Sequence, residues 1–309
     1  MVIRPADHGI FASSTGGGAA GAGYFGGGKI SAGTKVTTVD RFLFSDDSRT
    51  TLGTGLSAGT ESLAGMAGTV AGYFGGGTTG SLVDTVDRFL FSDDSRTTLG
   101  TGLSVACRSL GAMASTVAGY FGGGYASAGG GAPVDTVDRF LFSDDSRTTL
   151  GTGLATATQT LVGMASTVAG YFGGGYASGT VDTVDRFLFS DDSRTTLGTG
   201  LSAANQDLGA MASTVAGYFG GGDAGGGTST VDRFLFSDDS RTTLGTGLSA
   251  ARSHLAGMAS ADAGYFGGGY SGPTTTVDRF LFSDDSRTTL GTGLATGTGK
   301  LAAMAQNTA

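Results

Sequence analysis

Tryptophan is absent from this chain of 309 residues, which holds one cysteine, three prolines and two histidines. The single cysteine, Cys107, excludes an internal disulfide framework. One thiol and two histidines far apart in the sequence, His8 and His254, do not form the ligand set that zinc requires. We therefore predict no metal site and no cofactor.

Long apolar runs and a basic surface are also missing. No stretch approaches the roughly 20 apolar residues that span a bilayer, and the opening MVIRPADHGIFASSTGGG lacks the basic-then-apolar build of a signal peptide. The formal net charge of −8 gives no electrostatic footprint for nucleic acid. These absences predict no membrane insertion and no nucleic-acid partner.

Glycine, by contrast, is abundant, and many of its 60 copies lie in repeated phrases. GYFGGG occurs six times, and TVDRFLFSDDSRTTLGTGL occurs six times without a change, with successive copies 46 to 51 residues apart. A looser third phrase around a methionine has the same spacing. The tyrosines of the first phrase are Tyr24, Tyr73, Tyr120, Tyr171, Tyr218 and Tyr265. A fixed period of this size indicates a repeat fold.

Each repeat carries four strand signals and no helical period. In the first complete repeat these are 63–69 around the methionine, 71–76 with two aromatics, 85–92 ending at a polar turn, and 97–103. Four short strands per repeat are typical of a propeller blade. The sequence therefore predicts an all-β, six-bladed β-propeller with four antiparallel strands per blade, in which both aromatics of GYFGGG are buried.

The two ends of the chain are expected to meet. The first repeat begins at an aromatic strand, whereas the last segment, KLAAMAQNTA at 300–309, is a methionine strand with no aromatic strand after it. Pairing these strands would close the ring and remove exposed sheet edges. We expect residues 1–20 to be an N-terminal tail or tether and residues 21–309 to be the propeller.

The order of these phrases resembles the kelch repeat, in which a small strand precedes an aromatic strand ending in a glycine doublet. ARSHLAGMAS at 251–260 is the nearest local match, and Leu52 stands where that family usually carries tryptophan. The turn SDDSRTTL also resembles the Asp-box of sialidase-type blades, which it matches at Ser45, Asp47 and Thr51. The resemblance implies that the repeated Asp46–Asp47 pairs stabilise turns and are not catalytic.

Two windows differ among the six copies, one after GYFGGG and one before the methionine strand. The alternation of strands places both windows on one face of the ring, which we call the variable face, and the SDDSR turns on the other. Loops on a rigid scaffold often carry binding function. The predicted partner-binding residues of the variable face are Tyr125, Tyr176, Tyr270, Arg108, Arg252, His254, Gln159 and Gln206.

The repeats are also similar to those of proteins encoded by tailed bacteriophages. The resemblance implies a non-enzymatic structural or recognition module of a virion tail or surface, with a protein partner, a surface glycan or other virion proteins bound at the variable face. The alternative is a lectin-like or enzymatic propeller, extracellular or cytoplasmic. The absence of tryptophan, which commonly stacks on sugars, counts against a lectin, whereas Tyr125, Tyr176 and Tyr270 at equivalent loop positions favour one.

Overall fold

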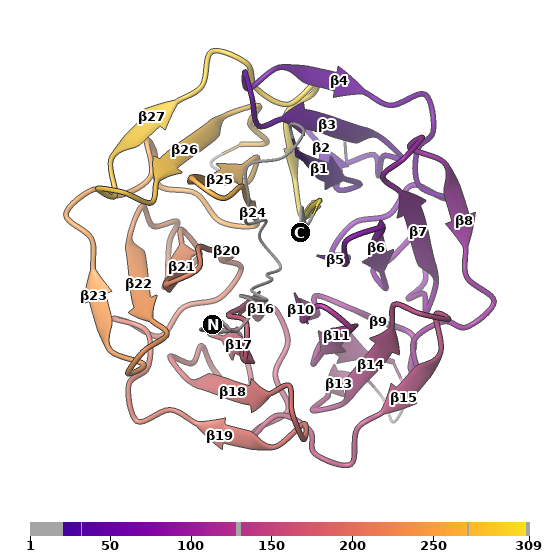
Figure 1. The fold of residues 1–309 in the computed structure, drawn as a ribbon, viewed down its shortest axis with the longest axis horizontal. Helices are drawn as coiled ribbons and strands as arrows, with labels where there is room; N and C mark the ends of the chain where they lie inside the picture. The colour runs from indigo at the N-terminus through magenta and orange to yellow at the C-terminus, as the bar shows by residue number, and fades with distance from the viewer. Residues whose placement is uncertain (1–20, 32, 128–130, 271, 307–309) are drawn as a thin grey trace, which may run out of the picture.

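The chain forms sheets around a central axis (Figure 1). The computed structural model describes residues 21–306 except 32, 128–130 and 271. Its regular structure is entirely β-strand, in six four-stranded antiparallel sheets and two smaller ones. Nowhere in these described ranges is there a helix long and apolar enough to cross a membrane. The all-β prediction is confirmed and the arrangement is propeller-like; the predicted tether at 1–20 lies outside the described residues.

Each four-stranded sheet uses the same four positions, counted outward from the axis. The inner strands are β5 (Ala64–Ala67), β10 (Gly111–Ala114), β16 (Val162–Ala165), β20 (Gly209–Ala212), β24 (Ala256–Ala259) and β29 (Ala302–Ala305). The second strands are β1 (Ala22–Gly26), β6 (Ala71–Gly75), β11 (Ala118–Gly122), β17 (Ala169–Gly173), β21 (Ala216–Gly220) and β25 (Ala263–Gly267). The third strands are β3 (Val39–Leu43), β7 (Val86–Leu90), β14 (Val137–Leu141), β18 (Val184–Leu188), β22 (Val231–Leu235) and β26 (Val277–Leu281). The outer strands are β4 (Arg49–Thr51), β8 (Arg96–Thr98), β15 (Arg147–Thr149), β19 (Arg194–Thr196), β23 (Arg241–Thr243) and β27 (Arg287–Thr289).

The two ends of the described chain share one sheet. Strand β29 pairs antiparallel with β1, from Gly23 opposite Ala305 to Gly26 opposite Ala302. Each inner strand also contacts the inner strands of the sheets on both sides, and β29 contacts β24 and β5. The expected pairing of the first and last strands is therefore present.

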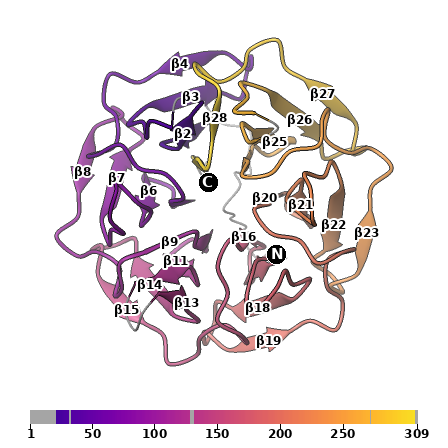
Figure 2. The same cartoon turned by 180° about the vertical axis from the view of Figure 1, so that it is seen from behind.

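Two small sheets join the variable windows. Strand β2 (Lys29–Ile30) pairs with β28 (Thr298–Gly299), and β12 (Tyr125–Ala126) pairs with β9 (Cys107–Arg108) and β13 (Ala132–Pro133). Figure 2 shows β2 and β28 beside the central opening. The two windows of a repeat thus lie side by side on one face, as the alternation of strands predicted.

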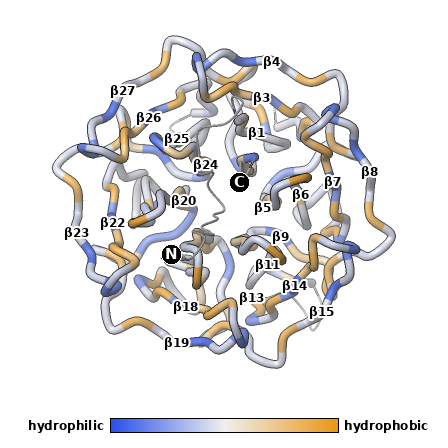
Figure 3. Tube along the Cα trace, viewed as in Figure 1, coloured by the Kyte–Doolittle hydropathy of each residue, from blue (hydrophilic) through white to orange (hydrophobic). Residues whose placement is uncertain are grey.

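The aromatic pair of GYFGGG packs on both sides of its sheet. Tyr24 stacks on Phe91 of the neighbouring sheet with ring centroids 5.5 Å apart, and Phe25 meets Phe42 of its own sheet edge to face at 5.6 Å. Both rings are buried in every copy. Burying one such side chain contributes about 1.5–3 kcal/mol, so the repeated rings form the core. Figure 3 shows hydrophilic turns around the outer rim.

The glycine doublet that follows allows the chain to turn sharply. Gly27 and Gly28 have φ of 65° and 99°, a region that side chains disfavour. A Cβ atom on Gly27 would lie 2.7 Å from the carbonyl oxygen of Thr60. Positive φ and close backbone approach therefore both favour glycine at these positions.

The unchanged phrase forms the contacts between neighbouring sheets. Asp87 of VDRFL accepts hydrogen bonds from the amide and hydroxyl of Ser57, which belongs to the preceding repeat, at 2.7 and 2.8 Å. Its other carboxylate oxygen accepts one from Thr98 at 2.6 Å. Since the same aspartate joins three segments in each copy, the identity of the phrase has a structural reason.

The outer strand differs from the prediction. It covers Arg96–Thr98 and ends before the glycines of the expected 97–103 strand. After Leu99 the chain turns inward, and the amide of Leu103 donates to the carbonyl of Asp84 at 2.8 Å. Leu103 is then buried. The GTGL segment is therefore the crossing to the next sheet, because its buried leucine holds it against the end of its own sheet.

Candidate functional site

In each repeat, the variable window that precedes the inner strand ends at one residue. The backbones of these six residues form a hydrogen-bonded ring around the axis. We call these six residues the pore positions: Ser62, Ser109, Thr160, Asp207, His254 and Lys300. Each amide donates to the carbonyl of the pore position in the preceding repeat, at 2.6 to 3.0 Å. The amide of Ser62 donates to the carbonyl of Lys300 at 2.8 Å, so the ring is continuous.

All six pore positions have a left-handed backbone. Their φ angles lie between 55° and 59°, where a residue with a side chain costs roughly 1–2 kcal/mol more than glycine. None of them is glycine, in a chain with 60 glycines. The strain is therefore retained together with side chains that differ from repeat to repeat.

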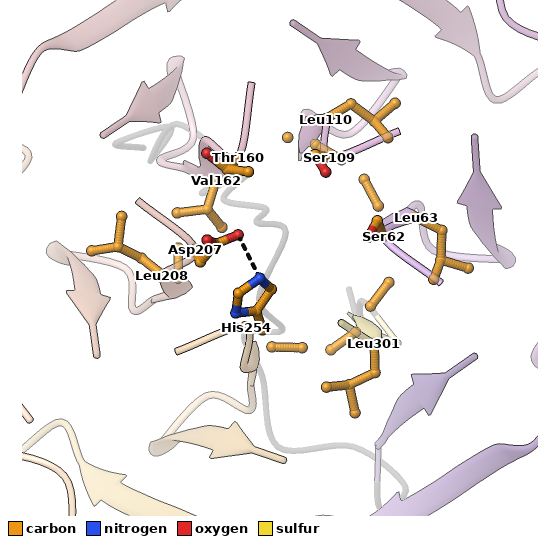
Figure 4. Close-up of a pocket in the computed structure, with 18 of the residues that line it drawn as sticks. Ser62, Leu63, Ser109, Leu110, Thr160, Val162, Asp207, Leu208, His254 and Leu301 are labelled. Atoms are coloured by element: carbon orange, nitrogen blue, oxygen red, sulfur yellow. Dashed lines mark ion pairs between the residues drawn. The ribbon is translucent and has the colours of Figure 1, made fainter. Parts of the chain in front are cut away.

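The pore positions surround a pocket of about 110 Å³ on the axis (Figure 4). Its wall is made by the first residues of the inner strands, which are small or aliphatic, including Gly65, Gly111, Val162 and Gly257. Figure 3 shows hydrophilic segments of the chain next to β20 and β24. The pocket combines an apolar wall with a polar rim, as small-molecule sites do.

The rim has two chemically distinct halves. Ser62, Ser109 and Thr160 supply hydroxyl groups on one side, and Asp207, His254 and Lys300 supply titratable groups on the other. Behind Lys300 lies the buried Glu61, whose carboxylate is 3.8 Å from the Lys300 ammonium and 3.5 Å from that of Lys35.

Asp207 and His254 form a close pair across the pocket edge (Figure 4). His254 Nε2 lies 3.2 Å from Asp207 Oδ1. Burial raises the pKa of Asp207 to about 7, and burial together with the Lys300 charge lowers the pKa of His254 to about 4. Between about pH 4 and 7 the two groups together therefore hold one titratable proton.

The outer part of the variable face is made where the two windows pair. Arg108 lies opposite Tyr125, with its guanidinium 5.2 Å from the ring centroid. The backbone of Gln159 forms an antiparallel β-bridge with that of Tyr176, which is 38% exposed. Gln206 bridges to Asp223. Tyr270 bridges to Ser253 and meets the His254 ring edge to face at 5.5 Å.

Arg252 is a correction among the predicted binding residues. It is only 1% exposed. Its Nη2 lies 3.1 Å from Asp278 Oδ2 and donates to the carbonyl of Phe266 at 3.1 Å. Its window position is buried in all six repeats, so the arginine supports the sheet and is not available to a partner. The other predicted residues lie at or near the surface of the variable face.

The paired aspartates of the SDDSR turn have separate structural roles. Asp46 accepts a hydrogen bond from the Ser48 amide at 3.0 Å, as a turn cap does. Asp47 reaches the neighbouring sheet, where it accepts from Tyr265 and Arg279. Across the part of the chain that the structure describes, no group of three or more acidic, histidine or cysteine residues is placed to hold a metal ion.

Most of the pocket residues were missed as a site from the sequence. His254 was predicted, but Ser62, Ser109, Thr160, Asp207 and Lys300 were only members of a variable window. The signal was present, because they occupy the same place in each window, immediately before the conserved leucine of the inner strand. Only the ring geometry shows that this place faces the axis.

No protein-family model matches the chain, and no curated protein matches its sequence. Its fold is similar to the solved structure of YjhT, with a TM-score of 0.67. The two sequences are 13% identical over 79% of this chain and 86% of that chain. At an identity this low, the structural likeness shows a shared propeller-like fold only.

The prediction that this protein is not an enzyme is wrong. It rested on the resemblance to phage-encoded repeat proteins, and the likeness of the fold to that of YjhT removes this ground for excluding an enzyme. One fold can serve binding modules and enzymes, so function has to be argued from the residues of a site. The coupled Asp207–His254 pair shows that the pocket holds groups able to exchange a proton.

Proposed function

We propose that the chain is a closed six-bladed β-propeller of kelch-like strand order and that it binds a saccharide in the axial pocket. The fold part of the proposal is supported by the shared sheet of β29 and β1 and by the ring of hydrogen bonds between pore positions. The order of small strand, aromatic strand and glycine doublet supports the kelch-like assignment.

One observation carries the ligand part of the proposal. Glycine would relieve backbone strain at every pore position, and yet all six positions keep a polar side chain. Strained backbone that persists at a concave site is typical of functional residues. The repeated phrase explains stability elsewhere in the molecule, whereas these side chains form no core.

The chemistry of the rim favours a small neutral polyol over an ion. The hydroxyls of Ser62 and Ser109 can each donate and accept, and the Thr160 hydroxyl, which donates to the Gln159 carbonyl at 2.6 Å, can accept, which suits the hydroxyls of a sugar. The charges of Lys35 and Lys300 are partly offset by Glu61, which lies 3.5 Å and 3.8 Å from their ammonium groups, so the rim has no strong charge of one sign. The ring of His254, which lines the pocket, supplies a flat surface of the kind that tryptophan would otherwise provide.

A triple variant separates ligand binding from stability. Ser62→Gly, Ser109→Gly and Thr160→Gly together remove three hydroxyls at positions where glycine is the least strained residue. We expect binding to a sugar identified on a glycan array to weaken by about 10- to 2,000-fold, at roughly 0.5–1.5 kcal/mol for each of three hydrogen bonds. The melting temperature should be unchanged or higher.

The matched control removes a charge from the opposite face. Asp46→Asn lies in an exposed SDDSR turn and should leave the affinity for the sugar unchanged. Equal binding by the triple variant and the wild type would refute the axial site. If no glycan is retained by the folded wild type at millimolar concentration, the saccharide assignment is wrong.

Docking of a macromolecular partner on the outer variable face is the second candidate. The observations that favour it are the exposed ring of Tyr176 and, in the preceding repeat, the stacked Arg108–Tyr125 pair, since Tyr and Arg are enriched at interface hot spots. A virion protein or a surface glycan on the host cell would suit this face. Labelling of purified virus particles with an antibody against the chain tests the virion assignment, and unlabelled particles would reject it.

A further inference from the structure

Serine, histidine and aspartate side chains form a continuous line that begins at the pocket, which Asp207 and His254 line, and ends at the buried Ser253. The hydroxyl oxygen of Ser253 lies 3.0 Å from His254 Nδ1. On the other side of the ring, His254 Nε2 lies 3.2 Å from Asp207 Oδ1. Both imidazole nitrogens are therefore engaged, one by a hydroxyl and the other by a carboxylate.

The partners determine which nitrogen carries the proton. An ionised carboxylate can only accept a hydrogen bond, so Nε2 donates to Asp207. Nδ1 then has a free electron pair and accepts the Ser253 hydroxyl proton. This is the arrangement in which histidine acts as a general base toward serine, with aspartate fixing the tautomer.

The surroundings hold the three groups in place and limit their contact with water. The backbones of Ser253 and Tyr270 exchange hydrogen bonds at 3.1 and 2.7 Å. Ser253 is 8% exposed, and its His254 neighbour borders the pocket. Lys300 lines the same pocket, and its charge lowers the pKa of both His254 and Asp207, so a cation lies within electrostatic reach of the pair.

The combination occurs once among the six repeats. The corresponding two residues elsewhere are Glu61-Ser62, Arg108-Ser109, Gln159-Thr160, Gln206-Asp207 and Gly299-Lys300. A serine followed by histidine, with aspartate at the preceding pore position, is found only in the fifth window. The line is thus a local departure from the repeat.

We propose that Ser253, His254 and Asp207 form a hydrolytic triad that cleaves carboxylic esters, and, resting on the saccharide-binding proposal, that the natural substrate is an O-acylated sugar. Ser253 Oγ attacks the ester carbonyl carbon while its proton passes to His254 Nδ1. The tetrahedral intermediate expels the sugar oxygen, which takes that proton, and leaves an acyl-Ser253. Water then attacks the acyl group and loses a proton to Nδ1, and the acid departs as Ser253 recovers its proton.

The reaction should require the ionised form of Asp207. The groups that face the His254–Asp207 pair are Lys300, Asp223, Glu61 and Tyr270, together with Ser253. With the pKa of Asp207 near 7, ester hydrolysis should increase as the pH rises from 6 to 8.

The test uses the full chain, p-nitrophenyl acetate and a fluorophosphonate probe. We expect measurable turnover and a covalent label on the peptide that contains Ser253. Ser253→Ala should abolish the label, and Ser253→Ala and His254→Asn should each lower turnover by about a hundredfold or more, as loss of a triad member does. Ser45→Ala, an exposed turn serine, should match the wild type.

The outcomes separate this proposal from the saccharide proposal. Labelling and turnover without retention of any glycan would support the triad and reject the sugar. Glycan binding by a folded protein that is neither labelled nor able to hydrolyse the ester would reject the triad and leave the sugar site standing. A label on another serine, with Ser253 unmodified, would also overturn the triad.

Discussion

The Tyr265 hydroxyl donates a hydrogen bond to Asp47 Oδ1 at 2.9 Å, although 218 positions separate the two residues in the chain. Arg279 donates to the other carboxylate oxygen of Asp47 at 2.8 Å. In the other five repeats the equivalent tyrosine binds the equivalent aspartate of the next sheet, at 2.7 to 3.0 Å. The hydrogen bonds from Tyr265 and Arg279 to Asp47, which we call the Asp47 clamp, therefore join the last complete repeat to the first.

Loss of the Asp47 charge should weaken this clamp. Asp47→Asn keeps a residue that tolerates the left-handed backbone at φ 55° but removes the charge that Tyr265 and Arg279 share. We expect a decrease of about 1–3 kcal/mol in the free energy of unfolding, measured by urea denaturation. Asp46→Asn, which loses part of one exposed cap, should cost less than about 1 kcal/mol. Equal losses in the two variants would show that Asp47 is only a turn cap.

Deletion of residues 300–309 should open the ring. The deletion removes β29, which pairs with β1 and contacts β24 and β5. The second strand β1 would become an exposed edge, and exposed edges promote strand exchange and aggregation. Size-exclusion chromatography should show oligomers or aggregates. A monomer as stable as the full chain would contradict the closure of the ring by β29.

Arg252 and Arg108 should differ sharply despite similar places in their windows. Arg252→Ala removes a fully buried ion pair with Asp278 and a hydrogen bond to the Phe266 carbonyl while Arg287 stays 3.5 Å from Asp278, and should cost about 1.5–3 kcal/mol. Arg108→Ala removes a partly exposed side chain stacked on Tyr125 and should cost less than about 1 kcal/mol. Thermal unfolding of both variants measures the difference, and similar melting temperatures would contradict the structural role of Arg252.

The Asp207–His254 pair should give opposite pH dependences when either member is removed. In Asp207→Asn, the remaining His254 has a folded-state pKa near 4, below its ordinary 6.5, so the variant loses stability as the pH falls from 6.5 to 4. In His254→Asn, the remaining Asp207 has a folded-state pKa near 7, above its ordinary 3.8, so that variant loses stability as the pH rises from 3.8 to 7.

In the wild type the two effects should nearly cancel. Between about pH 4 and 6.5 the pair holds one proton in the folded state, and the unfolded chain also holds one, on histidine. Urea denaturation at pH 4.5 and 6.5 should therefore show slopes of opposite sign for the two variants. Slopes of the same sign would mean that the pKa of at least one of the two groups is not shifted in the direction described.

The repeat made much of the fold predictable from the sequence. Period, strand order and the unmatched strands at the two ends indicated a ring, and the structure places β29 beside β1. The outer strand was misplaced because the residue pattern of TTLGTGL is typical of a strand. In the structure Leu103 is buried, and the hydrogen bond from its backbone amide to the Asp84 carbonyl turns that segment inward.

The site was harder to predict, because the residue types in the repeated and variable positions do not reveal where each side chain points. Asp46 and Asp47 are adjacent in every copy, and only the backbone sends one to its own turn and the other to the next sheet. Arg252 and His254 are two positions apart, and yet the first is buried in the sheet and the second faces the axis. These directions depend on φ at a single residue, which composition does not encode.

The most direct measurement of the central claim is a crystal structure of the full chain with a sugar selected on a glycan array. The axial-site account predicts electron density for the sugar on the axis, with hydrogen bonds to Thr160 and at least one of Asp207 and His254. Sugar density only beside Tyr176 on the outer variable face, or only among the SDDSR turns, would contradict it.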